Sequence, residues 1–165
     1  MKKWSLKHIA KEIVTTLLMV FIISLLINHF RQPEVSDQLP KLELTTLTGE
    51  EASTHNAGKP TVLHFWATWC PTCKFEAPNL EAIQDEVNLI TVVVNSGEDQ
   101  TVRDFIKEQG YGYSVVNDRD GKLAQQFNVE AFPTTFMYDA TGALAFVEVG
   151  YSTSLGLQAR VALIE

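Results

Sequence analysis

Cysteine is scarce in this chain of 165 residues, which contains only two, at positions 70 and 73. The four histidines are scattered along the sequence, so the chain lacks the compact set of about four ligands that a structural zinc site needs. A purely structural disulfide over so short a spacing would also stabilise the fold only weakly, because it removes little entropy from the unfolded chain. The sequence has no internal repeat and no low-complexity segment. Its length predicts a single domain of ordinary size.

Basic residues are rare beyond the N-terminal segment. Residues 1–31 hold five of the thirteen basic residues and one of the twenty acidic ones, so residues 32–165 keep eight basic and nineteen acidic residues, a net charge of −11. Such an acidic surface argues against binding to nucleic acid or to anionic lipid, both of which require positive charge.

Charge is absent from residues 13–30, which form an apolar run. As a helix, these residues would be about 27 Å long, just enough to cross the hydrocarbon core of a membrane. Four lysines precede the run and only Arg31 follows closely, so we expect the N-terminus in the cytoplasm and the rest of the chain outside.

A cleaved signal peptide is the main alternative, but residues 28–31 are bulky and polar and offer no small-x-small cleavage site. A buried core helix is disfavoured by the flanking lysines. We therefore expect a cytoplasmic N-terminus and an uncleaved signal anchor in residues 1–31. A polar tether with two prolines follows at residues 32–40, and the domain proper spans residues 41–165.

The two cysteines follow an apolar, β-branched and aromatic run at residues 61–66, which predicts a buried strand. Helical composition continues over residues 74–86, and Pro71 suits the first helical position. Cys70 is thus expected at a helix N-terminus, where free N–H groups and the helix dipole favour a thiolate. Cys73 would share its face, at a distance that a disulfide can bridge. Redox chemistry is the favoured interpretation over two reduced core cysteines.

Further strands are expected at residues 42–47, 89–94, 113–116, 134–138 and 143–149, the last two as a hairpin. Helices are expected at residues 99–109, capped by Asp99 or Thr101, at residues 122–127, and in the tail from Ser152, capped there or at Thr153. Residues 117–121 are expected to form a polar turn. Strands that alternate with helices predict an α/β protein built around one sheet.

The active-site stretch, residues 65–73 (Phe-Trp-Ala-Thr-Trp-Cys-Pro-Thr-Cys), together with the Phe-Pro-Thr-Thr run at residues 132–135, resembles the thioredoxin superfamily. With Glu76 and Pro78 added, it is similar to the membrane-anchored TlpA/ResA-type branch of bacterial thiol-disulfide oxidoreductases. Residues 96–99, 115–118 and 150–156 resemble the ScsD-like group, which is linked to suppression of copper sensitivity. The resemblance implies a thioredoxin-like fold: a central mixed sheet flanked by helices, here with an N-terminal transmembrane helix.

The resemblance also assigns roles to residues. Cys70 matches the solvent-accessible nucleophile and Cys73 the resolving thiol of a redox-active disulfide. Pro133 matches a proline that is cis in the superfamily, and the backbone of Phe132 is expected to pair with an extended substrate. We expect the substrate-contacting surface to comprise Trp69, Pro71, Thr72, Phe132 and Pro133.

Two further residues have alternative interpretations. Glu76 matches an active-site acid that could relay a proton to or from Cys73, or it is an exposed helix glutamate. His64 occupies the position of a buried aspartate in thioredoxin, where a histidine could act as a base, lower a thiol pKa if charged, or be a neutral core group.

The resemblance implies a periplasmic thiol-disulfide oxidoreductase held at the bacterial inner membrane by a single span. It reduces disulfides in substrate proteins, needs no bound cofactor, and receives electrons from a membrane donor of the DsbD or ScsB type. Two alternatives stay open: the same residues work as a thiol oxidase, or they bind Cu(I) in a copper-tolerance system. A third is an anchor protein with an inert disulfide.

Overall fold

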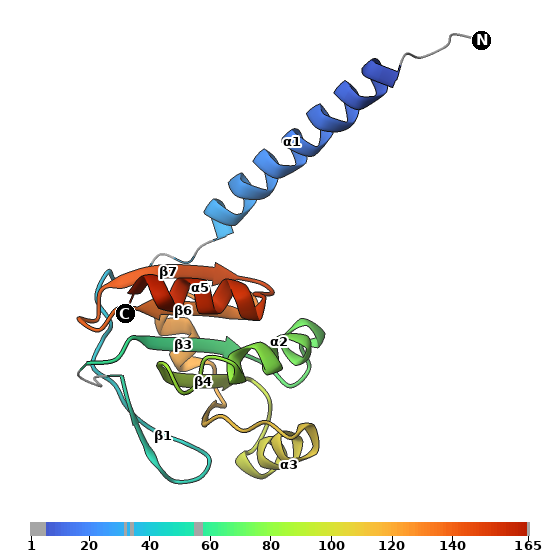
Figure 1. The fold of residues 1–165 in the computed structure, drawn as a ribbon. Coiled ribbons are helices and arrows are strands. Elements are labelled where there is room, and N and C mark those ends of the chain that lie inside the picture. Colours follow the sequence, from blue (N-terminus) through green and yellow to red (C-terminus); the bar gives the residue numbers. More distant parts are fainter. Residues whose placement is uncertain (1–5, 32, 34, 55–57, 165) are drawn as a thin grey trace. The chain divides into compact units, whose positions relative to one another are not determined.

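The computed structural model describes residues 6–31, 33, 35–54 and 58–164, and the chain divides into two units, residues 1–32 and 33–165. The first unit is one long helix, α1 (Leu6–Arg31), shown in blue in Figure 1. Within the part of the chain that the structure describes, no helix has the length and apolar character needed to cross a membrane. His55 lies outside the described residues.

The second unit is built on a five-stranded mixed sheet in the order β5-β4-β3-β6-β7. Its central strand, β3 (Thr61–Trp66), is parallel to β4 (Asn88–Val94) and antiparallel to β6 (Thr134–Tyr138). The outer strands are β5 (Val115–Asp118), parallel to β4, and β7 (Leu144–Val149), antiparallel to β6. The expected mixed sheet is confirmed.

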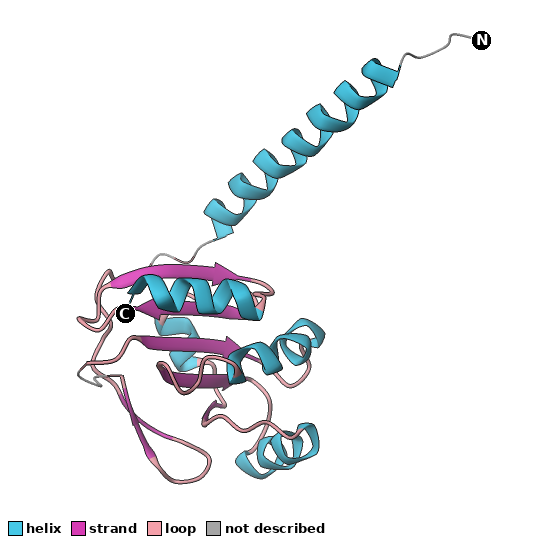
Figure 2. Cartoon of the chain, in the orientation of Figure 1, coloured by secondary structure: helices cyan, strands magenta, loops and turns pink. Residues whose placement is uncertain are grey.

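Helices cover both faces of this sheet (Figure 2). One face packs against α2 (Pro71–Glu81), α3 (Asp99–Gln109) and α5 (Ser154–Ile164), with a core that includes Val62, Trp66 and Met137. The other face packs against α4 (Lys122–Gln126) and the chain before β1, around Phe65 and Phe136. The two cores account for the uninterrupted apolar runs of β3 and β4, which are buried on both faces.

Several expected boundaries were wrong. The helix after Cys73 ends at Glu81 instead of residue 86, and turns follow it. Asn117 and Asp118 belong to β5 instead of a turn, and α3 is capped by Glu98, without a side-chain hydrogen bond. The strand expected at residues 42–47 shortens to β1 (Glu43–Thr45), which pairs with an unexpected β2 (Glu51–Ser53) in a separate two-stranded sheet.

The segment before β1 joins the second unit earlier than its polar composition indicates. The N–H of Leu39 donates to the carbonyl of Gly142, and the N–H of Leu144 donates to the carbonyl of Asp37. Val35 and Leu39 also pack against the core around Phe65. Ordered contacts with the domain therefore begin within residues 32–40.

One end of the sheet gathers the residues of interest. The carboxyl ends of β3, β4 and β7 lie there, as does the start of β6, because Thr134 pairs with both Phe65 and Val149. The loop that carries Cys70 and the loop that carries Pro133 therefore lie together beyond Trp66. Ligand-binding loops occupy the same place, at the carboxyl ends of strands, in open α/β sheets.

Candidate functional site

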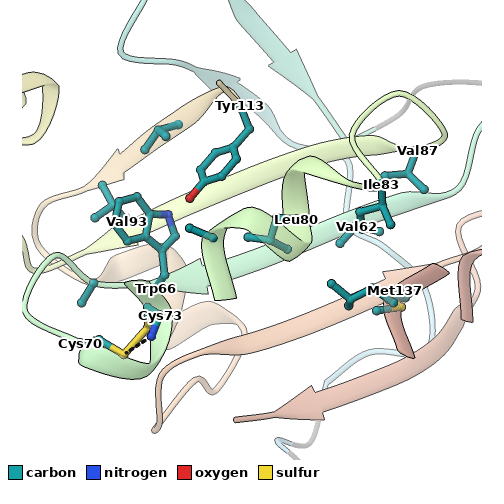
Figure 3. Close-up of a cluster of buried hydrophobic side chains, with 14 of the residues drawn as sticks. Val62, Trp66, Cys70, Cys73, Leu80, Ile83, Val87, Val93, Tyr113 and Met137 are labelled. Atoms are coloured by element: carbon teal, nitrogen blue, oxygen red, sulfur yellow. Dashed lines mark hydrogen bonds between the residues drawn. A yellow bond between two sulfur atoms is a disulfide. The ribbon is translucent and has the colours of Figure 1, made fainter. Parts of the chain in front are cut away.

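Cys70 and Cys73 form a disulfide with a Cα–Cα distance of 5.4 Å, within the ordinary range for such bridges. Figure 3 shows it at the end of the core, beside the indole of Trp66. Both residues are nearly buried, with 5% of Cys70 and 3% of Cys73 exposed. Exposure alone therefore does not distinguish the expected nucleophile in the oxidised form. The surroundings do, because Cys70 is the N-cap residue of α2 and its sulfur lies against the carbonyl oxygen of Phe132.

The N-terminus of α2 is formed by Cys70 itself. Cys70 is the N-cap residue, Pro71 occupies the first helical turn as expected, and the sulfur of Cys70 accepts a hydrogen bond from the N–H of Cys73 at 3.2 Å. Proline fits there because the first N–H groups of a helix have no partner within the helix. In the reduced protein, the same N–H and the helix dipole would stabilise a thiolate on Cys70.

The peptide bond between Phe132 and Pro133 is cis, as the resemblance implies. The carbonyl oxygen of Phe132 lies 3.7 Å from the sulfur of Cys70. The loop before β6 thus brings its backbone directly against the disulfide.

Trp69 is the large exposed side chain beside this contact, with 59% of its surface accessible. Its indole N–H donates to the carbonyl of Asn95 at 3.2 Å, and its ring packs edge-on against Phe132 at 5.6 Å. A hollow of about 470 Å³ opens next to these residues, lined among others by Asn95, Gln125, Glu130 and Phe132. The disulfide is therefore flanked by an exposed aromatic ring and a polar hollow.

Glu76 is completely buried, so the interpretation of an exposed helix glutamate is wrong. Its Oε1 accepts a hydrogen bond from the N–H of Ser152 at 3.0 Å, whereas Oε2 is buried and has no hydrogen-bond partner. Burial raises the pKa of Glu76 to about 7, although the hydrogen bonds from Ser152 lower it and the nearby Glu148 raises it slightly. A carboxyl group one helical turn from Cys73 can thus exchange a proton at neutral pH.

His64 is buried on β3, and its Nδ1 lies 2.9 Å from the hydroxyl oxygen of Thr135 on the neighbouring β6. Burial lowers the pKa of His64 to about 3, so the imidazole is neutral at pH 7. Burial therefore argues against a charged histidine that lowers a thiol pKa. A neutral, hydrogen-bonded core group fits this environment, on the face of the sheet that α2 covers, and action as a base stays a prediction.

The structure brings the expected residues Trp69, Cys70, Cys73 and Phe132 into contact. Three partners were missed: Asn95 for Trp69, Thr135 for His64, and Ser152 for Glu76. The register of β3 and β6 places Thr135 opposite His64, but strand pairing is not visible in a single sequence. Among the described residues, no group of three or more histidine, cysteine or acidic side chains is arranged to hold a metal ion.

Comparisons with known proteins agree with this geometry. Residues 34–159 match the Redoxin family. The chain is 36% identical to sporulation thiol-disulfide oxidoreductase A of Bacillus subtilis, over 67% of this chain and 72% of the relative. It is 27% identical to a thioredoxin-like protein of Haemophilus influenzae, over 97% of both chains. The crystal structure of StoA from Bacillus subtilis superposes with a TM-score of 0.68 at 30% identity, covering 76% of this chain and 98% of that one.

Proposed function

The chain belongs to the Redoxin family, and from this premise we propose that it reduces disulfides in other proteins through Cys70 and Cys73. It is a thiol-disulfide oxidoreductase of the thioredoxin fold. The observation that carries the proposal is the position of the disulfide, at a helix N-terminus and against the backbone of Phe132. There a thiolate is stabilised and a substrate strand can be bound beside it.

The cycle begins with the reduced protein. The Cys70 thiolate attacks one sulfur of the substrate disulfide, the substrate S–S bond breaks, and the other substrate sulfur leaves as a thiolate that takes up a proton. Cys73 then gives its proton to the carboxylate of Glu76 and attacks the sulfur of Cys70. The second substrate sulfur leaves, and the protein keeps the Cys70–Cys73 disulfide. Two electrons have passed to the substrate, and a membrane donor of the DsbD or ScsB type returns them.

Substrate contacts are assigned to the surface around the disulfide. The backbone of Phe132 pairs with an extended segment, Pro133 holds that backbone in place, and Trp69, Pro71 and Thr72 contact the residues that flank the substrate cysteine. Thiol exchange is preferred over Cu(I) binding, because a metal carrier needs neither a proline loop opposite the cysteines nor an exposed tryptophan before them.

Localisation is a further part of the proposal. This part rests on the sequence and not on the described helix α1: residues 13–30 serve as an uncleaved inner-membrane anchor and leave residues 41–165 in the periplasm, because an uncharged apolar run follows four lysines. Cell fractionation tests this. The full chain should stay with the membrane after alkaline carbonate extraction, and protease added from the periplasmic side should remove the domain. Release of the full chain by carbonate, or protection of its domain, would overturn the anchor.

Trapping in cells tests the function itself. The Cys73→Ala protein should accumulate as mixed disulfides between Cys70 and its substrates, because the resolving thiol is absent. Cys70→Ala is the matched control and should trap none. The direction of electron flow is tested by equilibration with glutathione: a reductase should have a potential near that of thioredoxin, about −270 mV, whereas a value near about −120 mV would mark an oxidase.

A further inference from the structure

Residues 150–154, which link β7 to α5 and include Ser154, the first residue of α5, contact both halves of the redox site. The N–H of Gly150 donates to the carbonyl of Pro133 at 2.8 Å, and the N–H of Ser152 donates to Oε1 of Glu76 at 3.0 Å. We call residues 150–154 the connector. The connector joins the loop of Phe132 and Pro133, which faces Cys70, to the helix that carries Cys73 and Glu76.

Besides Glu76, the half-buried side chain of Asn79 also binds the connector to α2. The amide Nδ2 of Asn79 donates to the carbonyl of Ser152 at 2.8 Å and to the hydroxyl of Tyr151 at 3.1 Å. Its Oδ1 accepts from the hydroxyl of Ser154 at 2.6 Å. Both N–H bonds and the carbonyl oxygen of one amide are therefore used on the same short segment.

Asn79 lies three residues after Glu76 on α2, so both side chains project from one helical face. Each of them binds Ser152: Asn79 through its carbonyl, and Glu76 through its N–H. The N–H and the carbonyl belong to the two peptide groups that flank the Cα of Ser152, so the backbone conformation of Ser152 links the direction of one to that of the other. A side chain that fixes the carbonyl therefore also restrains the N–H that faces the buried carboxylate.

We propose that Asn79 is a positioning residue of the redox site, which latches the connector to α2 and thereby keeps the Ser152 N–H on Glu76. The inference rests on the proposed role of Glu76 as proton acceptor for Cys73. The hydrogen bonds of Asn79 go to residues 151, 152 and 154 and not to the reacting sulfurs. Asn79 acts through Ser152, and its loss changes the pH at which Cys73 can be deprotonated.

The expected direction follows from the charge that the bond stabilises. The N–H of Ser152 donates to Glu76, and this contact favours the ionised carboxylate. Without Asn79 the Ser152 N–H turns away, so the pKa of Glu76 should rise further above 7. The rest of the connector keeps its position. The N–H of Gly150 still donates to the carbonyl of Pro133, and the N–H of Leu157 in α5 still donates to the carbonyl of Thr153.

Other titratable groups around Glu76 do not depend on Asn79. Glu148 of β7 is paired with Arg160 of α5 at 2.7 Å. Burial raises the pKa of Tyr113 well above its usual range, and His64 of β3 is neutral. None of these groups is hydrogen-bonded to Asn79 in the structure. If mutation of Asn79 shifts the pKa of Glu76, the shift is therefore caused by a change in the connector.

The test uses the full chain in detergent, reduced and then mixed with the aromatic disulfide dithionitrobenzoate. Attack by Cys70 releases one thionitrobenzoate and leaves the other attached to Cys70. Attack by Cys73 on that mixed disulfide releases the second as the Cys70–Cys73 bond forms. The rate of the second release, followed by absorbance from pH 5 to 9, should show a midpoint set by Glu76, and Glu76→Gln should remove it.

In Asn79→Ala the midpoint should rise by about one pH unit, the effect of losing one hydrogen bond to a carboxylate. Ser154→Ala, which removes one of the bonds to Asn79 and serves if Asn79→Ala does not fold, should give a smaller rise. The matched control is Asn88→Ala, because Asn88 is also half-buried and bonds a backbone carbonyl, that of Ser53, at the far end of the sheet. It should leave the midpoint unchanged.

The two possible failures are distinguishable. If Glu76→Gln leaves the profile of the second release unchanged, the proton-acceptor role of Glu76 is wrong, and the inference falls with it. If Glu76→Gln removes the midpoint while Asn79→Ala and Ser154→Ala leave it in place or lower it, the role of Glu76 stands and the latch is wrong.

Discussion

The sulfur of Cys70 lies 3.7 Å from the carbonyl oxygen of Phe132, although the two residues are 62 positions apart in the chain. Phe132 directly precedes the cis proline, and its ring packs against Trp69, the residue before Cys70. Backbone for strand pairing, an aromatic surface and a reactive sulfur therefore meet at one point. This arrangement suits a partner that presents a cysteine on an extended segment.

The first prediction concerns the ring of Trp69. Trp69→Ala removes the edge-on contact with Phe132 and the hydrogen bond to Asn95, so turnover of a protein disulfide should fall about tenfold. Trp69→Phe keeps an aromatic ring and should fall less. Reduction of a small disulfide such as dithionitrobenzoate should change little in either variant. An equal loss with small and protein substrates would instead indicate damage to the cysteine pair.

The second prediction concerns stability and Glu76. Because burial raises the pKa of Glu76 from 4.5 to about 7, the folded state binds this proton more tightly than the unfolded state does. The stabilisation is complete below pH 4.5 and is lost as pH rises through 7, by up to about 3 kcal/mol. Glu76→Gln should remove this loss. In urea unfolding, the free energy of unfolding of the variant relative to that of the parent should therefore increase between pH 5 and pH 8.

Glu81→Gln is the control for this comparison, since it removes a carboxylate from the end of the same helix, where Glu81 is only half-buried. It should keep the pH dependence of the parent. If the free energy of unfolding changes with pH in the same way in the parent and in Glu76→Gln across this range, Glu76 does not titrate there.

Neighbouring residues on α2 show why the sequence predicts some of this site and not the rest. Phe75 is 76% exposed and Glu76 is fully buried, the reverse of what their hydrophobicity indicates. The position of Glu76 depends on a hydrogen bond to Ser152, 76 residues away, and such pairing is not encoded in local pattern. By contrast, the strand before the cysteines and Pro71 at the helix start were predicted correctly, because apolar runs and proline act locally.

The same distinction explains the error at β5. Asn117 and Asp118 are polar residues of the kind that favour turns, so the sequence predicts a turn at the end of the strand. In the fold, Asn117 donates to the carbonyl of Gly97 and to the carboxylate of Asp99, while Asp118 accepts from the N–H of Ala124. Tertiary hydrogen bonds thus engage the Nδ2 of Asn117 and the carboxylate of Asp118 within a strand, while the buried Oδ1 of Asn117 has no hydrogen-bond partner.

The third prediction concerns His64. Its pKa is about 3 in the folded protein and 6.5 when unfolded, so the stabilisation is present above pH 6.5 and is lost as pH falls toward 3. The loss should approach about 1.4 kcal/mol per pH unit within this window. His64→Asn should be less stable than the parent at pH 7, because packing is lost. In urea titrations it should then lose less stability than the parent between pH 7 and pH 4.

Acidification also protonates Glu76, which has the opposite sign, so the informative quantity is the difference between the parent and His64→Asn at each pH. That difference should narrow as pH falls. A constant difference would mean that His64 titrates alike in the folded and unfolded states, which its burial beside Thr135 argues against.

The central claim is that Cys70 and Cys73 transfer electrons to other proteins, with Cys70 as the attacking sulfur. Reduction of insulin disulfides by the purified protein, driven by dithiothreitol, measures this most directly when the parent is compared with Cys70→Ser and Cys73→Ser. We predict activity in the parent, none above the uncatalysed rate in Cys70→Ser, and in Cys73→Ser a protein that stalls as a mixed disulfide through Cys70. Full activity in Cys70→Ser would contradict the account.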